Sequence, residues 1–431
     1  MKSHLSVVRP SDFRRWAGLF AVCTLLSLLV PWAATADAQV PPPASAFISA
    51  SGSNLVLGGQ SVRFIGYNLP CAQPFLLDTG QLDYVLANIA DNSGATALRM
   101  WFFQSNGGPG NWGPFDQVIA AAKSHGMRII PTMVNEWPTC EPVTAATQPR
   151  KTLSWYQAGY HQAGDGYPLS FRDFAVQVAA HYADEPAIAF WQLVNEAEAP
   201  TLQPGGGLTC DEPTAAGALR AFGDDMSAAL HTADSHHLVS LGTLGGSQCG
   251  LAGADFSYIH AGTVDLCEYH DYNDPLNPLG TGQVDGLAAR LNQCRNLPGG
   301  GKPLFVGEAG IVNNVQPTGP QPAPGSGPPL TLESLQTRAR LFHDKITAAF
   351  NAGVAGYQIW FKGPAFSSAD ESFAIGDGDP TEAMMRSVPL TGPPATVPES
   401  SANILLPLSA IVVLGGGGAV IWRRKRRAEQ G

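Results

Sequence analysis

Charged residues are scarce in this chain of 431 residues, since Asp, Glu, Lys and Arg make up only 14% of it, against about a quarter in ordinary globular domains. No internal repeat is recognisable, so the length favours one large domain. No glycine-rich phosphate loop follows the first predicted strand, which argues against a nucleotide-binding fold. The cysteines form neither a Cys-x-x-Cys motif nor a Cys/His cluster, so neither a metal site nor a cofactor is expected.

Basic residues are few in the body of the chain. The net charge is −10, and nine of the 25 basic residues lie in the two terminal segments, against three of the 35 acidic ones. The part between them is therefore more acidic than the whole. Such a surface argues against nucleic acid or an anionic membrane surface as a partner. It is compatible with a neutral substrate such as a sugar polymer.

The first 38 residues have the pattern of a secretory signal. Arg14 and Arg15 precede an apolar run from Trp16 to Val30, and Ala36-Asp37-Ala38 offers a cleavage site between small residues. We therefore predict a signal peptide over 1–38 and export of the remainder. An anchor helix that is not cleaved is the alternative.

The C-terminal segment predicts attachment to the cell surface. Residues 404–422 carry no charge and are long enough to span a bilayer, and the basic tail 423–431 follows and is expected to stay cytoplasmic. A Pro/Ser/Thr-rich linker over 389–403 separates this helix from the main domain. Val388-Pro389-Leu390-Thr391-Gly392 resembles a sortase sorting motif, and Val397-Pro398-Glu399-Ser400 is a rival. Sortase-type processing and a plain transmembrane anchor both stay open, on the outer face of the membrane or in the cell wall.

Residues 47–388 alternate short apolar or β-branched runs with longer helical ones, as in repeated βαβ units. We predict strands over 62–67, 97–102, 128–134, 188–194, 238–243, 264–269, 303–307 and 356–360. The main helices are expected over 82–92, 115–124, 171–182, 215–232, 284–293 and 332–351. Eight such strands favour a closed (β/α)8 barrel over a doubly wound open sheet.

Two glutamates end predicted strands. Glu196 closes the fourth strand in an Asn-Glu pair, and Glu308 closes the seventh. Barrel enzymes keep their chemistry at this end of the strands, and glycosidic bonds are broken between two carboxyl groups. The pair therefore predicts a glycosidase that uses Glu196 and Glu308 as its two catalytic carboxyl groups.

Other polar and aromatic side chains lie at the same rim. Arg99 in the second strand needs a buried partner, and Glu308 is the natural one. The alternation of side chains places His270 and Tyr272 on the barrel-facing side of the sixth strand. Trp360 ends the eighth strand and is expected under a sugar ring. A structural salt bridge, a core histidine and a core tryptophan are the alternatives.

Six cysteines lie in the exported part, an even number that suggests disulfides. Strand parity points Cys267 outwards, towards the helix that carries Cys294, so this pair is favoured. The other two expected pairs, which would tie rim loops together, are Cys71 with Cys140 and Cys210 with Cys249.

Together these residues resemble glycoside hydrolase family 5, in the clan of retaining (β/α)8 glycosidases, over about residues 47–360. The matching positions are Arg99, Asn195-Glu196, His270-x-Tyr272, Glu308 and Trp360. The resemblance implies that Glu196 is the acid/base and Glu308 the nucleophile. It also implies that Asn195 binds the substrate 2-hydroxyl, that Arg99 and Tyr272 set the nucleophile, and that Trp360 lines the subsite of the cleaved sugar.

Within that family, two segments are similar to endo-β-1,4-mannanases. These are Arg99-Met100-Trp101-Phe102-Phe103 and Val134-Asn135-Glu136-Trp137, in which Glu136 replaces an Asn. The resemblance adds Trp101 and Asn135 to the substrate-binding residues. It implies a retaining endo-β-1,4-glycanase that prefers β-mannan to cellulose. An exo-acting β-glycosidase and a surface glycan-binding protein without catalysis are the alternatives.

Overall fold

The computed structural model describes residues 46–137, 140, 150–164, 166–323, 326–363 and 373–390. The predicted signal peptide, the linker from residue 391, the transmembrane helix and the basic tail lie outside the described residues. Among the residues that are described, no helix is both long enough and apolar enough to cross a membrane.

Eight parallel strands form the central sheet. They are β4 (Phe64–Leu69), β5 (Ala97–Trp101), β6 (Arg128–Asn135), β7 (Trp191–Asn195), β10 (Val239–Ser240), β11 (Cys267–Asp271), β12 (Leu304–Ala309) and β13 (Gly356–Ile359). Each strand except β10 pairs with the strand of this sheet that follows it in the chain, and β13 returns to pair with β4. A parallel bridge between Ser240 and Leu266 joins β10 to the start of β11. The sheet is therefore a barrel, as predicted, and not an open sheet.

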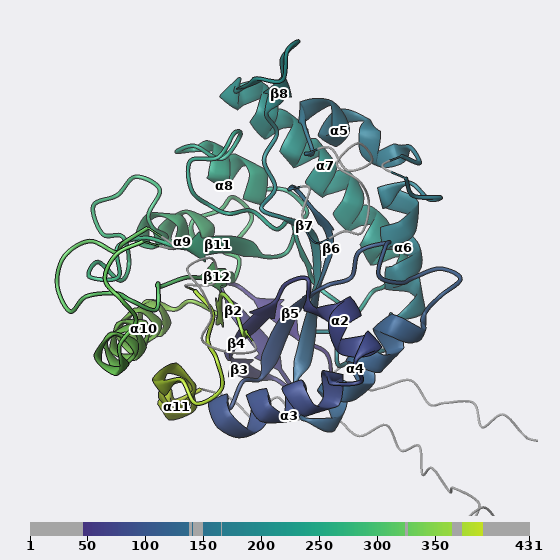
Figure 1. The fold of residues 1–431 in the computed structure, drawn as a ribbon. Coiled ribbons are helices and arrows are strands. Elements are labelled where there is room, and N and C mark those ends of the chain that lie inside the picture. Colours follow the sequence, from purple (N-terminus) through teal and green to yellow (C-terminus); the bar gives the residue numbers. More distant parts are fainter. Residues whose placement is uncertain are drawn as a thin grey trace, which may run out of the picture. The chain divides into compact units, whose positions relative to one another are not determined.

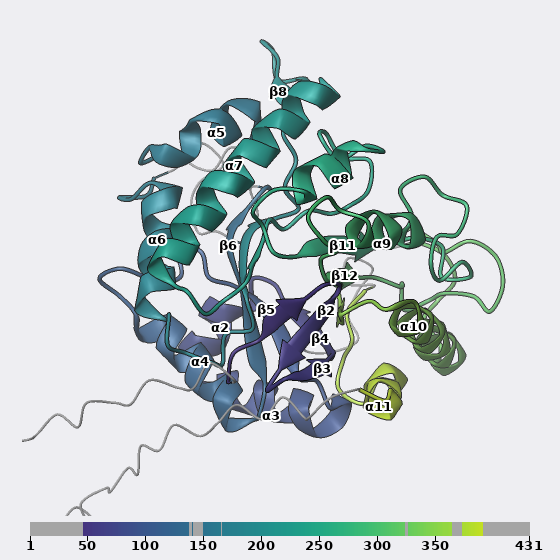
Figure 2. The same cartoon turned by 180° about the vertical axis from the view of Figure 1, so that it is seen from behind.

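Helices surround these strands (Figures 1 and 2). They are α2 (Ala72–Asp78), α3 (Leu82–Ser93), α4 (Gly113–Ser124), α5 (Leu153–Gln157), α6 (Phe171–His181), α7 (Glu212–Ala233), α8 (Asp255–His260), α9 (Leu287–Arg295), α10 (Leu332–Ala352) and α11 (Pro380–Ser387). In α3 the buried residues Leu82, Leu86 and Ile89 recur every three or four positions, which places them on one face. Helix α10 begins with a capping box at Thr331 and ends at Gly353.

The first predicted strand was wrong in its extent. Residues 62–67 belong to two strands, because β3 (Gln60–Val62) forms an antiparallel sheet with β1 (Ser49–Ser51) and β2 (Asn54–Leu57) before the barrel begins at Phe64. The predicted fifth strand was also too long. Gly242 lies there with a φ of 89° and packs on the Val194 carbonyl, so the chain leaves the extended conformation early.

Several short elements in the loops were not predicted. They are α2, α5, α8, α11, the 3-10 turn Gly159–His161 and the hairpin of β8 (Thr201–Leu202) with β9 (Leu208–Thr209). All are eight residues or shorter, so periodicity gives little signal for them.

The barrel interior changes character along its length. At the amino ends of the strands, Phe64, Phe190 and Phe305 pack with ring centroids 4.9–6.0 Å apart. Leu55 and Leu57 of β2 join the same cluster, so the antiparallel sheet contributes to the apolar packing there. Further along the strands, the buried residues Arg99, Gln192 and Glu268 are polar. The apolar layer excludes water from the amino end of the barrel, while the polar layer lies beneath the side chains at the carboxyl ends of the strands.

Three disulfides tie the loops to the barrel. Cys267 of β11 is bonded to Cys294 of α9, and the other bonds are Cys71–Cys140 and Cys210–Cys249. The pair Cys267–Cys294, favoured from strand parity, is confirmed, and the other two bonds agree with pairings that the sequence did not decide. The bond between Cys210 and Cys249 fixes the loop that follows Glu196 to the loop that follows β10.

Gly66 of β4 allows a close approach between strands. A Cβ at this position would overlap the carbonyl oxygen of Ala97 in β5. We expect Gly66→Ala to lower stability by about 1–3 kcal/mol or more, the usual range for overpacking. Gly113→Ala is the matched control, because a Cβ there meets nothing within 4 Å. Thermal unfolding of both variants tests this, and equal midpoints would contradict it.

Candidate active site

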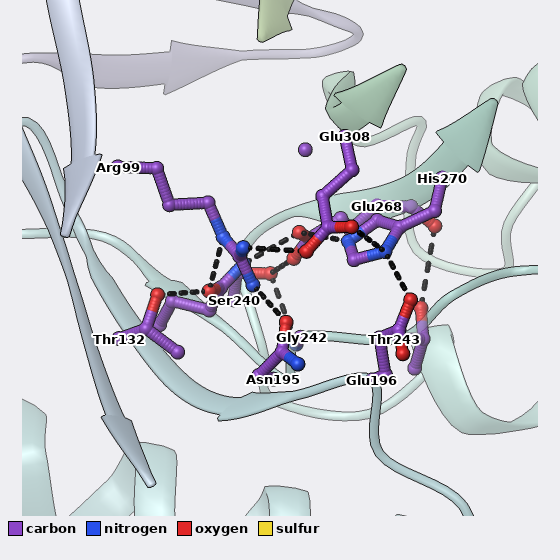
Figure 3. Close-up of polar contacts among 12 residues, drawn as sticks. Arg99, Thr132, Asn195, Glu196, Ser240, Gly242, Thr243, Glu268, His270 and Glu308 are labelled. Carbon is purple, nitrogen blue, oxygen red and sulfur yellow. Dashed lines mark hydrogen bonds and ion pairs between the residues drawn. The ribbon is translucent and has the colours of Figure 1, made fainter. Parts of the chain in front are cut away.

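Glu196 and Glu308 meet at the carboxyl ends of the strands (Figure 3). Glu196 follows β7 directly, with a positive φ of 58°, which is uncommon for a residue with a side chain. Glu308 lies inside β12, where the pairing with β11 slips by one residue, so that His270 is opposite Glu308 and Gly307 is extra. A strict alternation would place Gly307 and Glu308 on opposite faces. The bulge therefore lets both residues face the site.

The two carboxyl groups are close. One oxygen of Glu196 and one of Glu308 lie within 4.8 Å of each other and of a His270 ring nitrogen. Glu308 is nearly buried, with 3% of its side chain exposed, whereas Glu196 is 15% exposed. The site therefore holds one sheltered carboxylate and one that faces the solvent.

Each carboxyl group has its own donors. Glu308 Oε1 accepts from Arg99 Nη1 at 2.8 Å, and its Oε2 accepts from the Tyr272 hydroxyl at 2.7 Å. Glu196 Oε2 accepts from the Trp137 indole at 2.7 Å, and its Oε1 lies 2.9 Å from His270 Nδ1. The predicted partnership of Arg99 with Glu308 is present, and His270, predicted to face the barrel, lies against Glu196.

Arg99 is fully buried and joins several strands. Its guanidinium donates to Gln192 Oε1 at 2.8 Å, to Asn68 Oδ1 at 2.8 Å and to Asn195 Oδ1 at 2.6 Å, in addition to Glu308. These partners come from β7, β4 and β12. A buried guanidinium requires such acceptors, and here they fix Asn195 and Glu308 relative to each other.

Burial and neighbouring charges set the ionisation of the pair. Burial raises the pKa of Glu308 and the ionised Glu196 raises it further, against the opposing effects of His270 and Arg99. Burial also raises the pKa of Glu196, but contacts with His270 and Trp137 outweigh it and the net shift is downwards. Burial lowers the pKa of His270, yet Glu308, Glu196 and Glu268 together bring it to about 9. In the empty site the imidazole is therefore charged at neutral pH.

The remaining predicted site residues surround this centre. Asn195 Nδ2 donates to Asn135 Oδ1 at 2.9 Å, and the Trp137 backbone donates to the same oxygen. Trp101 lies 4.7 Å from the Arg99 guanidinium and 6.4 Å from the Trp360 ring. Trp360 is partly exposed. Asn135 thus positions other residues of the site, while Trp360 is open to a ligand.

Four residues of the site were missed by the sequence interpretation, namely Asn68, Trp137, Gln192 and Glu268. Asn68, Gln192 and Glu268 are polar residues inside otherwise apolar strands, which was a usable signal. The contact of Trp137 with Glu196 depends on how two loops fold together, and nothing in the sequence indicates it.

A cavity of about 590 Å³ adjoins the centre. Its lining includes His270 and Tyr272 from the site and, beyond them, Gln248, Asn273 and Asp285. The cavity shares His270 and Tyr272 with the site, while Glu196 and Glu308 are not among its lining residues.

Comparison with models of known protein families finds no match. The chain is 26% identical to a probable mannan endo-1,4-β-mannosidase C of Aspergillus terreus over 53% of its own length and 64% of the relative's, just under two thirds. It is 25% identical to a probable mannan endo-1,4-β-mannosidase A of Aspergillus oryzae over 69% of this chain and 81% of that relative. These relatives confirm the resemblance predicted from the sequence. The chain is a glycoside hydrolase.

Solved structures give the same fold for this hydrolase. An endo-1,4-β-mannanase of Rhizomucor miehei matches with a TM-score of 0.58 at 18% identity, over 79% of this chain and 97% of that one. A β-glucanase of Saccharophagus degradans in complex with cellotetraose matches with a TM-score of 0.51 at 15% identity, over 81% of this chain and 98% of that one. At such identities the likeness shows the barrel alone.

Tyr272 stabilises the charged form of Glu308 through its hydrogen bond. We expect Tyr272→Phe to lower kcat/KM of the hydrolase about 10- to 100-fold, the range for a hydrogen bond to a charged group. The pKa of Glu308 should rise, so the acidic limb of the pH profile should move to higher pH. Tyr182→Phe is the control, since its hydroxyl donates to Asp116, outside the site. An unchanged acidic limb in Tyr272→Phe would contradict the role of this contact.

Proposed function

We propose that the chain is a retaining endo-β-1,4-glycanase with Glu308 as nucleophile and Glu196 as acid/base. The observation that carries this proposal is the short separation of the two carboxyl groups, within 4.8 Å between their closest oxygens. Retaining glycosidases hold their carboxyl groups about 5–5.5 Å apart, whereas inverting ones need about 6.5–9.5 Å for a water molecule. The gap here leaves room for direct attack on the sugar.

In the first step, a Glu308 oxygen attacks the anomeric carbon while the glycosidic C–O bond breaks. The electron pair of that bond goes to the leaving oxygen, which takes a proton from Glu196. The product is a glycosyl ester on Glu308 and a shortened polysaccharide. Burial of Glu308 favours this step, because the carboxylate has little hydration to lose and Arg99 and Tyr272 already orient it.

In the second step, water gives a proton to Glu196 and attacks the same carbon, and Glu308 leaves as a carboxylate. Glu196 is the partly exposed member of the pair, which suits contact with water. Once Glu308 is esterified its negative charge is gone, so the balance of charge around His270 and Glu196 changes between the two steps.

We assign the substrate-binding residues from their positions around Glu196 and Glu308. Asn195 is held by Arg99 beside Glu196 and is assigned to the 2-hydroxyl. Trp360 is assigned to the face of the sugar whose bond is cleaved. Trp101 lies behind Trp360 and Asn135 behind Asn195, so both are assigned as supports of these contacts.

β-Mannan is the proposed substrate. Both sequence relatives are named mannan endo-1,4-β-mannosidases, and the segment Asn135-Glu136-Trp137 provides the indole that contacts Glu196. Both relatives are named as endo-acting enzymes, which favours cleavage within a chain over removal of terminal sugars.

We also propose export, with a C-terminal anchor or sortase-type processing of residues 389–431. Three disulfides support an oxidising compartment, and an extracellular location gives access to a polysaccharide.

Replacement of each glutamate tests the assignment. We expect Glu308→Gln to abolish turnover with the fold intact, because an amide does not attack. Glu196→Ala should lose activity on polysaccharide but still form the glycosyl-enzyme from a 2,4-dinitrophenyl glycoside, whose leaving group needs no proton. Near-normal turnover by Glu308→Gln would exclude it as nucleophile.

Product stereochemistry tests the double displacement, and substrate choice tests the preference for mannan and the endo action. NMR during early hydrolysis should show the β-anomer first. Release of reducing ends should be faster on mannan and glucomannan than on cellulose or mixed-linkage glucan, with a mixture of oligosaccharides at early times. The α-anomer first would exclude double displacement, and release of single sugars alone would indicate exo action.

A further inference from the structure

A third carboxylate lies buried beneath the catalytic pair. Glu268 of β11 has no exposed surface. Its Oε1 accepts from Gln192 Nε2 and lies 3.2 Å from His270 Nε2, and its Oε2 accepts from Ser240 Oγ at 2.8 Å. Figure 3 shows Glu268 close to His270, with Glu196 and Glu308 nearby. The proposed mechanism uses His270 and both catalytic glutamates but assigns no step to Glu268.

The backbone leaves space for this carboxylate. Gly307 is the extra residue of the bulge in β12, and a Cβ there would overlap Glu268 Oε1 and come within 3.1 Å of His270 Nε2. No other residue type fits at 307 while Glu268 keeps this position. The bulge that lets Glu308 face the site therefore also accommodates Glu268.

The charges around His270 can be counted. Three carboxylates face its imidazole, Glu268 at Nε2 and Glu196 and Glu308 at Nδ1. Arg99 is paired with Glu308, and Tyr272 donates to the same carboxylate. His270 and Trp137 favour the ionised form of Glu196, whereas the leaving group needs a proton from it. In that proton-donating form, counting Arg99 and His270 as cations, Glu308 and Glu268 as anions and Glu196 as a neutral acid, the group has no net charge. Neutrality is strongly favoured in a buried site.

Without Glu268 the same count gives a different result. The charge of His270 would then be balanced by ionised Glu196, at 2.9 Å, or His270 would lose its proton. In the first case the acid/base has no proton to give, and in the second the donor to Glu196 Oε1 is lost. A counter-ion on the far side of the ring raises the pKa of the proton that Glu196 and His270 share, and so favours the form in which Glu196 is protonated beside a charged His270.

We propose that Glu268 is a positioning residue that balances the charge of His270 from beneath and so lets Glu196 hold the proton for the leaving group. This inference rests on the proposed function, because it concerns the proton that Glu196 donates. Glu268 acts through His270 and does not contact the sugar.

Glu268→Gln tests the charge with little change in shape. The amide oxygen can still accept from Gln192 and the amide nitrogen can donate to the Ser240 hydroxyl, but one negative charge is removed next to His270. The pKa of the proton shared by Glu196 and His270 should fall, so the alkaline limb of kcat/KM on polysaccharide should move about 1 unit to lower pH. The glycosylation rate on a 2,4-dinitrophenyl glycoside should keep its wild-type alkaline limb, because that step needs no acid.

Two matched variants separate charge from packing. Ser240→Ala removes a hydrogen bond to Glu268 but no charge, and Asp265→Asn removes a carboxylate that pairs with His231 just before β11. Both should keep the wild-type alkaline limb. If Glu268→Gln fails to fold, Glu268→Asp, which retains the charge but draws it away from His270, should move the limb in the same direction by less.

An unmoved alkaline limb in Glu268→Gln, or an equal displacement in Ser240→Ala, would overturn the inference. Glu196→Ala distinguishes this failure from failure of the proposed function. If Glu196→Ala cleaves polysaccharide and the dinitrophenyl glycoside equally poorly, the assignment of the acid/base is wrong. If Glu196→Ala shows the expected difference and Glu268→Gln does not, only the role of Glu268 is wrong.

Discussion

One buried guanidinium organises the rim of this barrel. Arg99 reaches Asn68, Gln192, Asn195 and Glu308, which lie on three other strands. A buried charge with fewer acceptors would destabilise the fold by several kcal/mol, so the strands must take the register that presents all four. That requirement fixes Glu308, the proposed nucleophile, and Asn195, the proposed ligand of the 2-hydroxyl, relative to each other before any sugar binds. Preorganisation of this kind is the main way an enzyme stabilises charge in a transition state.

The two ends of the barrel differ in composition and in role. Packed phenylalanines and the small antiparallel sheet fill the amino end, which leaves the polar network of the carboxyl end away from water. In that surrounding, hydrogen bonds and charges interact more strongly than at a surface. The difference between a buried Glu308 and a partly exposed Glu196 matches the roles proposed for them, attack for Glu308 and proton exchange for Glu196.

Much of this arrangement could be predicted from the sequence. Glu196, Glu308, Arg99 and Trp360 each lie at the end of an apolar run or within one, and eight such runs imply a barrel that brings their ends together. What escaped prediction depends on contacts between strands. The bulge at Gly307 is a one-residue slip that hydrophobic patterns do not reveal, and the indole of Trp137 reaches Glu196 through loop geometry. The apolar run 62–67 contains a boundary between two sheets, which the hydrophobic pattern does not reveal because both strands pack against the same core.

The bulge also limits how such a site can change over evolutionary time. A Cβ at position 307 would overlap the carboxylate of Glu268, so a side chain at 307 is incompatible with a carboxylate at 268 in this position. A lineage that gains a residue other than glycine at 307 must first lose the carboxylate, and with it the partner of His270. The two positions should therefore change together or not at all, although they lie on different strands and 39 residues apart in the chain.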